Sequence, residues 1–430
     1  MKQIIYVLTL ISIFFLFGSM LLPFANTDWT MYHSNPSQSS NISLHNSALM
    51  PKRTWTSTIP PGYSTSPIVD NGIIYIGTGD GNICALSASS GKKIWNYTIS
   101  TYIVRSSPAI AQDIVYIGSD EALYALDVAT GVKIWSYPVY VHSSSPAVVD
   151  GVVYFGAGDG MVYALSALDG SEIWNYTTGM TSCATPVVYE GVVYIGGGRT
   201  YRGLYALDAV SGEEIWCYTP DWYKNNPWVS APAIGEGMIF YSTLFRLYGL
   251  SLESGDEVWC SMVRSWASPV VVNGMVFLGS GISGASPPSC YAFDAKTGSQ
   301  LWNYSAPRGS SFSDPAVGAG VVYFGSSDKS VYGLDVVSGG MVWNYSTDDG
   351  VTSIVSGVVL PSPVVGRGEV FVCSADGVLY AIVTGLDVAY FLWVLLPIIV
   401  TLTAFLAAVL LFKKYRKVMD NKRHLSPYPR

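Results

Sequence analysis

The stretch PAVVDGVVYFGAGDGMVYALSALDGSEIW, residues 146–174, decides the fold of this chain. It contains four short runs in which apolar and polar residues alternate, and each run is bounded by Gly, Asp or Pro. Alternation with a period of two indicates β-strands, and the Gly and Asp residues indicate tight turns between them. The stretch therefore predicts a sheet of four short strands.

The same pattern recurs along the chain. Each copy opens with Ser-Pro or a variant of it, and the anchor prolines are Pro67, Pro108, Pro146, Pro186, Pro232, Pro269, Pro315 and Pro363. The tryptophans that close the fourth run are spaced by 39 to 43 residues: Trp95, Trp135, Trp174, Trp216, Trp259, Trp302 and Trp343. Four strands in roughly 40 residues is the sequence form of one propeller blade. Eight copies predict an all-β, eight-bladed β-propeller of four-stranded blades.

The eighth copy lacks a tryptophan strand of its own. It runs through Pro363 and LYAI at 379–382 and then enters a long apolar segment. A lone strand, KRTWTSTI at 52–59, carries Trp55, which precedes Trp95 by 40 residues. We predict that this N-terminal strand completes the eighth blade and closes the ring, which removes the open edges of a linear array.

Three copies contain a turn motif that points to a known family. The motif reads ALDVATGVKIW at 125–135, ALDAVSGEEIW at 206–216 and AFDAKTGSQLW at 292–302. It resembles the Ala-x-Asp-x-x-Thr-Gly-x-x-x-Trp signature of the pyrroloquinoline-quinone-like (PQQ-like) propeller repeat, and DWTMYHSN at 28–35 is similar to the opening of such exported propellers. The resemblance covers about residues 27–383. Similar propellers occur in quinoprotein dehydrogenases, in the outer-membrane assembly lipoprotein BamB and in sensor ectodomains joined to kinases.

The chain departs from each of these relatives. It has no adjacent Cys-Cys pair and no long insertions with calcium ligands, so we expect no cofactor; PQQ and calcium are the alternative that these motifs do not support. The region around Ala25 has no cysteine for lipid modification, and only 18 residues follow Phe412. We therefore expect a non-catalytic propeller that binds a protein or glycan or scaffolds a cell-envelope complex. The alternatives are a PQQ-dependent dehydrogenase of alcohols or sugars and a stalked structural module of a surface layer.

Two apolar segments flank the propeller, which we place at 26–383. Residues 1–25 begin with Lys2 and resemble a secretory signal in layout, with an uncleaved anchor as the alternative. Val388–Phe412 has 25 residues without a charge, which is long enough for one transmembrane helix. Four basic residues follow directly, at 413, 414, 416 and 417, so the tail 413–430 is expected to be cytoplasmic and the propeller outside. An archaeal or similar cell surface fits best, with the propeller against the lipid bilayer.

The charge of the exported part limits the classes of partner, and its cysteine content bears on disulfides. Without Lys2, the seven basic tail residues and Asp420, the exported part has 15 basic and 29 acidic residues, or about −14. No basic footprint for nucleic acid is present there. Six cysteines at 84, 183, 217, 260, 290 and 373 permit disulfides in an exported domain, but the spacing selects no pairing.

Several residues are candidates for turns or sites. We interpret GTGDG at 77–81 and GAGDG at 156–160 as hairpin turns rather than nucleotide loops, because no helix is expected after them. The aspartates at 127, 208, 294 and 335 are expected to cap turns rather than to bind metal. The four histidines are isolated in sequence, and we predict no catalytic residue and no metal site.

Two further groups of residues are candidates for sites on the protein surface. Five sequons predict N-glycosylation at Asn41, Asn96, Asn175, Asn303 and Asn344. The alternative is that the repeat itself generates Trp-x-Tyr-Ser/Thr on its outer strands. In proteins that the chain resembles, the connections into the Ser-Pro anchor rim the central funnel, and aromatic and hydrogen-bonding residues there suit a sugar, a peptide or a protein loop. Ordinary packing of longer loops is the alternative. The candidate ligand-binding residues are Arg105, His142, Trp222, Tyr223, Lys224, Trp228, Arg264 and Trp266.

Overall fold

The structure is a computed structural model. It describes residues 51–60, 65–102, 104–141, 143–179, 184–197, 203–220, 229–280, 289–305, 312–347, 361–366, 368–374 and 377–383. The predicted signal, transmembrane span and tail lie outside these residues. Within the described part of the chain, no helix is long and apolar enough to cross a membrane.

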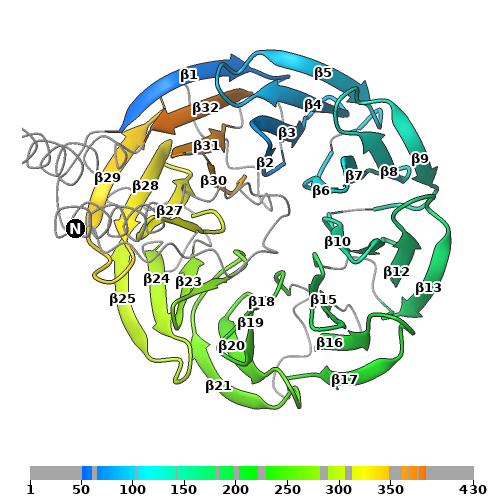
Figure 1. Ribbon diagram of the computed structural model, residues 1–430. Coiled ribbons are helices and arrows are strands. Elements are labelled where there is room, and N and C mark those ends of the chain that lie inside the picture. The colour runs from blue at the N-terminus through cyan, green and yellow to red at the C-terminus, as the bar shows by residue number, and fades with distance from the viewer. Residues whose placement is uncertain are drawn as a thin grey trace, which may run out of the picture.

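Eight antiparallel four-stranded sheets are arranged in a ring around a central axis (Figure 1), as the repeat predicted. We number the blades in chain order and the strands of each blade outward from the centre. Blades 1 to 4 consist of β2 (Ile68–Asp70), β3 (Ile73–Gly77), β4 (Asn82–Ser87) and β5 (Lys93–Thr98); β6 (Ala109–Ala111), β7 (Ile114–Gly118), β8 (Leu123–Asp127) and β9 (Lys133–Tyr137); β10 (Ala147–Val149), β11 (Val152–Gly156), β12 (Met161–Ser166) and β13 (Glu172–Thr177); and β14 (Val187–Tyr189), β15 (Val192–Gly197), β16 (Gly203–Asp208) and β17 (Glu214–Tyr218).

The second half of the ring repeats this arrangement. Blades 5 to 8 consist of β18 (Ala233–Gly235), β19 (Met238–Ser242), β20 (Arg246–Ser251) and β21 (Glu257–Met262); β22 (Val270–Val272), β23 (Met275–Gly279), β24 (Ser289–Asp294) and β25 (Gln300–Ser305); β26 (Ala316–Gly318), β27 (Val321–Ser326), β28 (Ser330–Asp335) and β29 (Met341–Ser346); and β30 (Val364–Gly366), β31 (Glu369–Cys373), β32 (Val378–Val383) and β1 (Lys52–Thr58).

The strand β1 closes the ring, as predicted. It pairs antiparallel with β32, and Trp55 lies opposite Ala381. The Trp55 ring packs 6.0 Å from the ring of Phe371 in the same blade, and its Nε1 donates to the carbonyl of Ala88 in blade 1 at 2.9 Å. Near the axis, the backbone N–H of Ser362 in blade 8 donates to Ser66 Oγ in blade 1 at 2.8 Å. The first and last blades are therefore joined at both the inner and the outer radius.

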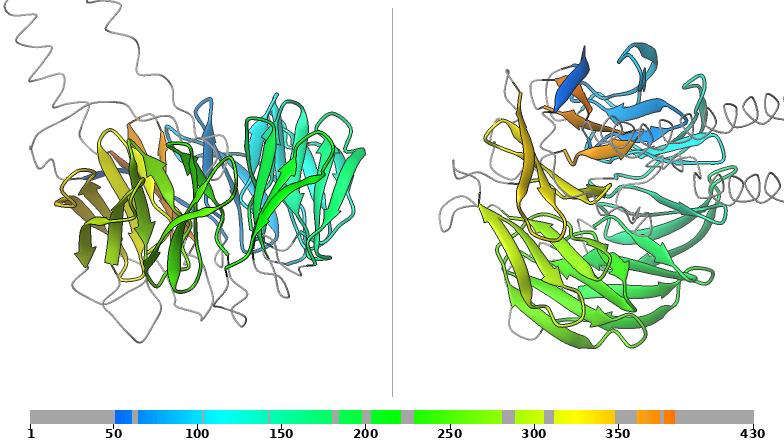
Figure 2. Two further views of the ribbon diagram at one scale, coloured as in Figure 1. Left: turned by 90° about the horizontal axis from the view of Figure 1, so that it is seen from below. Right: turned by 60° about the vertical axis from the view of Figure 1, so that its left-hand side comes forward.

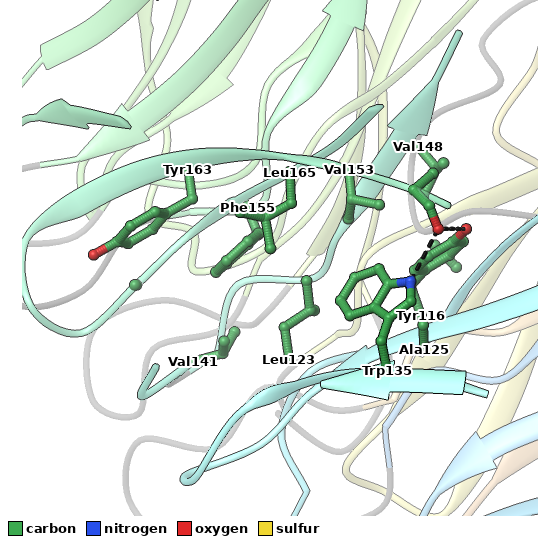
Figure 3. Packing of buried hydrophobic residues seen from close by; sticks show 13 residues of the cluster. Tyr116, Leu123, Ala125, Trp135, Val141, Val148, Val153, Phe155, Tyr163 and Leu165 are labelled. Atoms are coloured by element: carbon green, nitrogen blue, oxygen red, sulfur yellow. Dashed lines mark hydrogen bonds between the residues drawn. The ribbon is translucent and has the colours of Figure 1, made fainter. Parts of the chain in front are cut away.

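Neighbouring blades are held together by a tryptophan that docks on a glycine. Figure 3 shows the contact between blades 2 and 3, where Trp135 Nε1 and the Tyr116 hydroxyl both donate to the Ala167 carbonyl, each at 3.0 Å. Gly170 in blade 3 has φ +73°, and a Cβ there would lie 2.6 Å from the Trp135 ring. Such a position requires glycine for both its conformation and its close contact. The equivalent glycines are 91, 131, 212, 255, 298 and 339, which meet Trp55, Trp95, Trp174, Trp216, Trp259 and Trp302.

The tight turns follow the sequence predictions. In the turn that precedes Trp302, Asp294 Oδ1 accepts the backbone N–H of Thr297 at 2.8 Å, and Asp127, Asp208 and Asp335 make the same contact in their turns. In the two Gly-rich loops, Gly81 and Gly160 have positive φ and lead directly into β4 and β12. Both loops are therefore hairpin turns, as interpreted. The five cysteines that the structure describes are free thiols.

Candidate partner-binding face

The antiparallel order of the strands gives the disc two different faces. Turns between first and second strands, and between third and fourth strands, lie on one face, which we call the turn face. The hairpins between second and third strands and the connections from one blade to the next lie on the other, which we call the connection face. The edge-on view in Figure 2 shows the strands running between these two faces.

Both ends of the propeller chain leave through the turn face. Lys52, the first residue of β1, is paired with Val383, the last residue of β32. Because β1 starts and β32 ends on the turn face, Lys52 and Val383 lie next to each other on this face, in blade 8. The connection face is therefore the face turned away from both chain ends.

The three described candidate residues lie on the connection face but not together. Arg105 lies between β5 and β6, at the entrance to blade 2, whereas Arg264 and Trp266 lie between β21 and β22, at the entrance to blade 6. All three side chains are exposed. Blades 2 and 6 are on opposite sides of an eight-membered ring (Figure 1). The other candidates, His142, Trp222, Tyr223, Lys224 and Trp228, lie outside the described residues.

Arg105 belongs to a cluster that sequence reasoning did not assemble. The exposed Tyr140 in the next connection has a pKa raised by partial burial and by Asp120, while Arg105 lowers it. A Cβ at Gly158 would lie 2.1 Å from the Tyr140 ring, and the Gly158 N–H donates to the Tyr140 carbonyl at 2.8 Å. The β11–β12 hairpin therefore holds the Tyr140 ring at the connection face, where the charges of Asp120 and Arg105 act on its hydroxyl. The sequence signal for the Tyr140 contact was Gly158, which directly precedes the Asp159-Gly160 turn.

A second cluster surrounds Arg264. Its guanidinium lies over the Phe245 ring, 5.1 Å from the ring centroid. The backbone N–H of Val263 donates to the Phe245 carbonyl at 3.1 Å, which fixes the connection to the β19–β20 hairpin. A guanidinium over an aromatic face is attracted by the ring quadrupole, by about 0.5–1 kcal/mol at an exposed site. Phe245 and Arg264 thus form an aromatic and cationic pair, and the exposed Trp266 lies two residues further along the same connection.

The axial end of the connection face is lined by hydroxyl groups. The N–H of Ser107 donates to Ser145 Oγ at 2.9 Å, and the N–H of Ser145 donates to Thr185 Oγ1 at 3.0 Å. In blade 7 Asp314 takes the hydroxyl position, is 1% exposed, and accepts the N–H of Ser268 at 2.7 Å. These bonds link the blades from one anchor to the next.

None of the buried polar side chains among the described residues offers a positive charge to a quinone cofactor that carries several carboxylates. Among them every buried polar residue is Ser or Thr except Asp314, which adds a negative charge near the axis. A buried anionic ligand needs positive partners, since an unpaired buried charge is costly. The described residues also contain no group of three or more His, Cys, Asp or Glu side chains that could hold a metal ion.

The comparison with known families agrees with the repeat. The family model described as outer membrane protein assembly factor BamB matches residues 47–231 and 202–388. The chain belongs to this family. BamB of Moranella endobia is 30% identical over 146 residues, which cover 28% of this chain and 38% of that protein. The quinohemoprotein alcohol dehydrogenase of Comamonas testosteroni is 29% identical over 148 residues, 29% of this chain and 21% of that protein.

The match thus spans about a fifth of that dehydrogenase and well under half of that BamB. Among solved structures, BamB from Moraxella catarrhalis has a TM-score of 0.63 at 19% identity, with 78% of this chain and 98% of that chain covered. At that identity the likeness shows the fold alone. The family and the propeller architecture are common to relatives whose names state different activities.

Proposed function

We propose that this chain is a non-catalytic, membrane-anchored propeller outside the cytoplasmic membrane, and that it binds an envelope protein or glycan through its connection face. One observation carries the proposal: both chain ends leave through the turn face, whereas the exposed arginine and aromatic clusters lie on the opposite face. The assembly role stated in the name of the BamB relatives supports a protein as the partner.

The chain ends orient the propeller on the bilayer. The apolar span expected at Val388 begins only a few residues after Val383. An extended chain covers about 3.5 Å per residue, so roughly 17 Å separates the turn face at blade 8 from the start of the span. The turn face then lies next to the bilayer and the connection face points away from it. A partner in the envelope meets the connection face first.

The separation of the two clusters bears on the type of partner. The Arg105 and Arg264 clusters lie on opposite sides of the ring axis. A small ligand contacts one of them, whereas a folded protein or a long glycan contacts both at once. Once one cluster has bound the partner, the effective concentration of that partner at the other cluster is raised. We therefore favour an extended partner.

The experiment uses the full chain in its native membranes. Photo-cross-linkers at 105 and 264 should capture the same partner, and Arg105→Ala with Arg264→Ala should reduce its recovery at least tenfold. Val210→Ala on the turn face is the matched control, because Val210 is 82% exposed and its loss should change nothing. Capture through the turn face alone would contradict the proposal. So would dye-coupled alcohol oxidation after reconstitution with quinone and calcium, which would establish the dehydrogenase instead.

A further inference from the structure

Four of the predicted sequons occupy one equivalent position on the outer wall of the propeller. Asn96, Asn175, Asn303 and Asn344 directly follow the docking tryptophans of blades 1, 3, 6 and 7. Each lies in a fourth strand, the outermost strand of its sheet, and each side chain is exposed. The repeat thus brings four sites that are far apart in sequence onto one belt around the disc.

The local geometry of each site exposes the two groups that define a sequon. In β13, Asn175 and Thr177 are exposed, while Tyr176 between them is partly buried and packs on Tyr205 of blade 4, with ring centroids 6.1 Å apart. Alternate residues of a strand point to the same side. The amide and the hydroxyl therefore stand side by side on the outer surface, and the aromatic residue between them is anchored in the next blade.

The belt also marks a part of the molecule that benefits from cover. A fourth strand presents one unpaired backbone edge, which is a template for pairing with another chain. An exposed apolar residue lies two positions before three of the asparagines: Ile94, Ile173 and Leu301 are 49%, 48% and 49% exposed. A hydrophilic chain attached to the asparagine shields both the edge and the apolar side chain.

The belt is interrupted at blade 2 by Ser136, at blade 8 by Thr56, and at the two neighbouring blades 4 and 5. In blades 4 and 5 the same position is occupied by Cys217 in β17 and Cys260 in β21. Met262, two residues after Cys260, is 74% exposed. This arc of the wall has no acceptor asparagine at the equivalent position.

We propose that the outer wall carries N-linked glycans at Asn96, Asn175, Asn303 and Asn344, with a bare arc at blades 4 and 5. In each transfer the asparagine Nδ2 forms a bond to the anomeric carbon of a lipid-linked oligosaccharide. The bond from that carbon to the lipid phosphate breaks, the lipid phosphate leaves, and the amide gives up one proton. The proposal rests on the exported placement given under the proposed function.

The bare arc offers a sharp test, because the sequence Cys217-Tyr218-Thr219 becomes a sequon by one change. In chain isolated from membranes of its own cells, peptide mass spectrometry should find a glycan at each of the four asparagines. Cys217→Asn should add one glycan at the belt. Cys260→Asn, which is followed by Ser261 and Met262 and therefore lacks the hydroxyl, should add none.

Two controls separate recognition of the sequon from folding. Thr177→Val should remove the glycan at Asn175, and Thr177→Ser should retain it, whereas both variants should keep the same melting temperature after deglycosylation. Protease treatment of intact cells reports the placement. An exported chain with unmodified asparagines, or a glycan gained by Cys260→Asn, would overturn the belt and leave the placement intact. A chain protected from the protease would overturn both.

Discussion

Gly170 illustrates how one residue fixes a blade interface. With φ +73° and a Cβ position 2.6 Å from the Trp135 ring, alanine there meets two costs. The left-handed conformation costs about 1–2 kcal/mol, and forced overpacking adds about 1–3 kcal/mol. We expect Gly170→Ala to lower the free energy of unfolding by about 2–5 kcal/mol in urea denaturation. Gly151→Ala is the control, because φ is +78° and nothing lies within 4 Å of its Cβ; equal losses in both variants would show that the docking contact is unimportant.

Tyr241 in β19 gives a residue-scale prediction of the opposite sign. Its hydroxyl is buried and has no hydrogen-bond partner among the described residues, and the repeat places Ile195 and Leu278 at the equivalent positions of the neighbouring blades. An unsatisfied buried polar group costs about 1–3 kcal/mol. Tyr241→Phe should therefore raise the free energy of unfolding by about 1 kcal/mol. Tyr154→Phe, which loses a hydrogen bond to the Ala209 carbonyl at 3.1 Å, should lower it; destabilisation by both would contradict this account.

These residues also show what sequence can predict. The capping role of Asp294 follows from three neighbouring positions, so the local pattern was sufficient. Arg105, Asp120 and Tyr140 come from three separate loops. The surroundings of the Tyr241 hydroxyl are set by residues of other strands and of another blade. Contacts of this kind depend on how blades pack, and the alternation of apolar and polar residues carries no information about them.

At the scale of elements, β1 is the strand whose removal opens the ring. Trp55 is half-buried, so we take the lower part of the usual range and expect Trp55→Ala to cost about 3 kcal/mol. Trp55→Phe keeps a ring against Phe371 and loses the hydrogen bond to the Ala88 carbonyl, which should cost about 1 kcal/mol. Denaturation should stay a single transition in Trp55→Phe. A Trp55→Ala variant with wild-type stability would show that β1 does not hold blades 8 and 1 together.

The closure by β1 was predictable because the tryptophan spacing counts strands directly. The irregularity within each fourth strand was not. In blade 1, Trp95 pairs with Ala85 and Lys93 pairs with Leu86, which leaves Ile94 as an extra residue in a β-bulge. A bulge keeps the strand pattern on both sides and adds one residue, so sequence alternation alone does not reveal it. The bulge lies directly before the tryptophan that docks on the next blade.

For the whole molecule, buried and partly buried tyrosines between blades make stability depend on alkaline pH. Burial raises the pKa of Tyr116 to about 12, and burial followed by hydrogen bonds to Glu172 and Glu214 raises the pKa of Tyr137 and of Tyr176 to about 12. An unfolded tyrosine titrates near pH 10. The folded state therefore binds more protons between about pH 10 and 12, so this stabilisation is complete below pH 10 and is lost as pH rises through that window. Tyrosinate absorbance and circular dichroism should change together between about pH 10 and 12, and the slope of stability against pH should be shallower in Tyr137→Phe. Ionisation of these tyrosines near pH 10 in an intact fold would contradict this pH dependence.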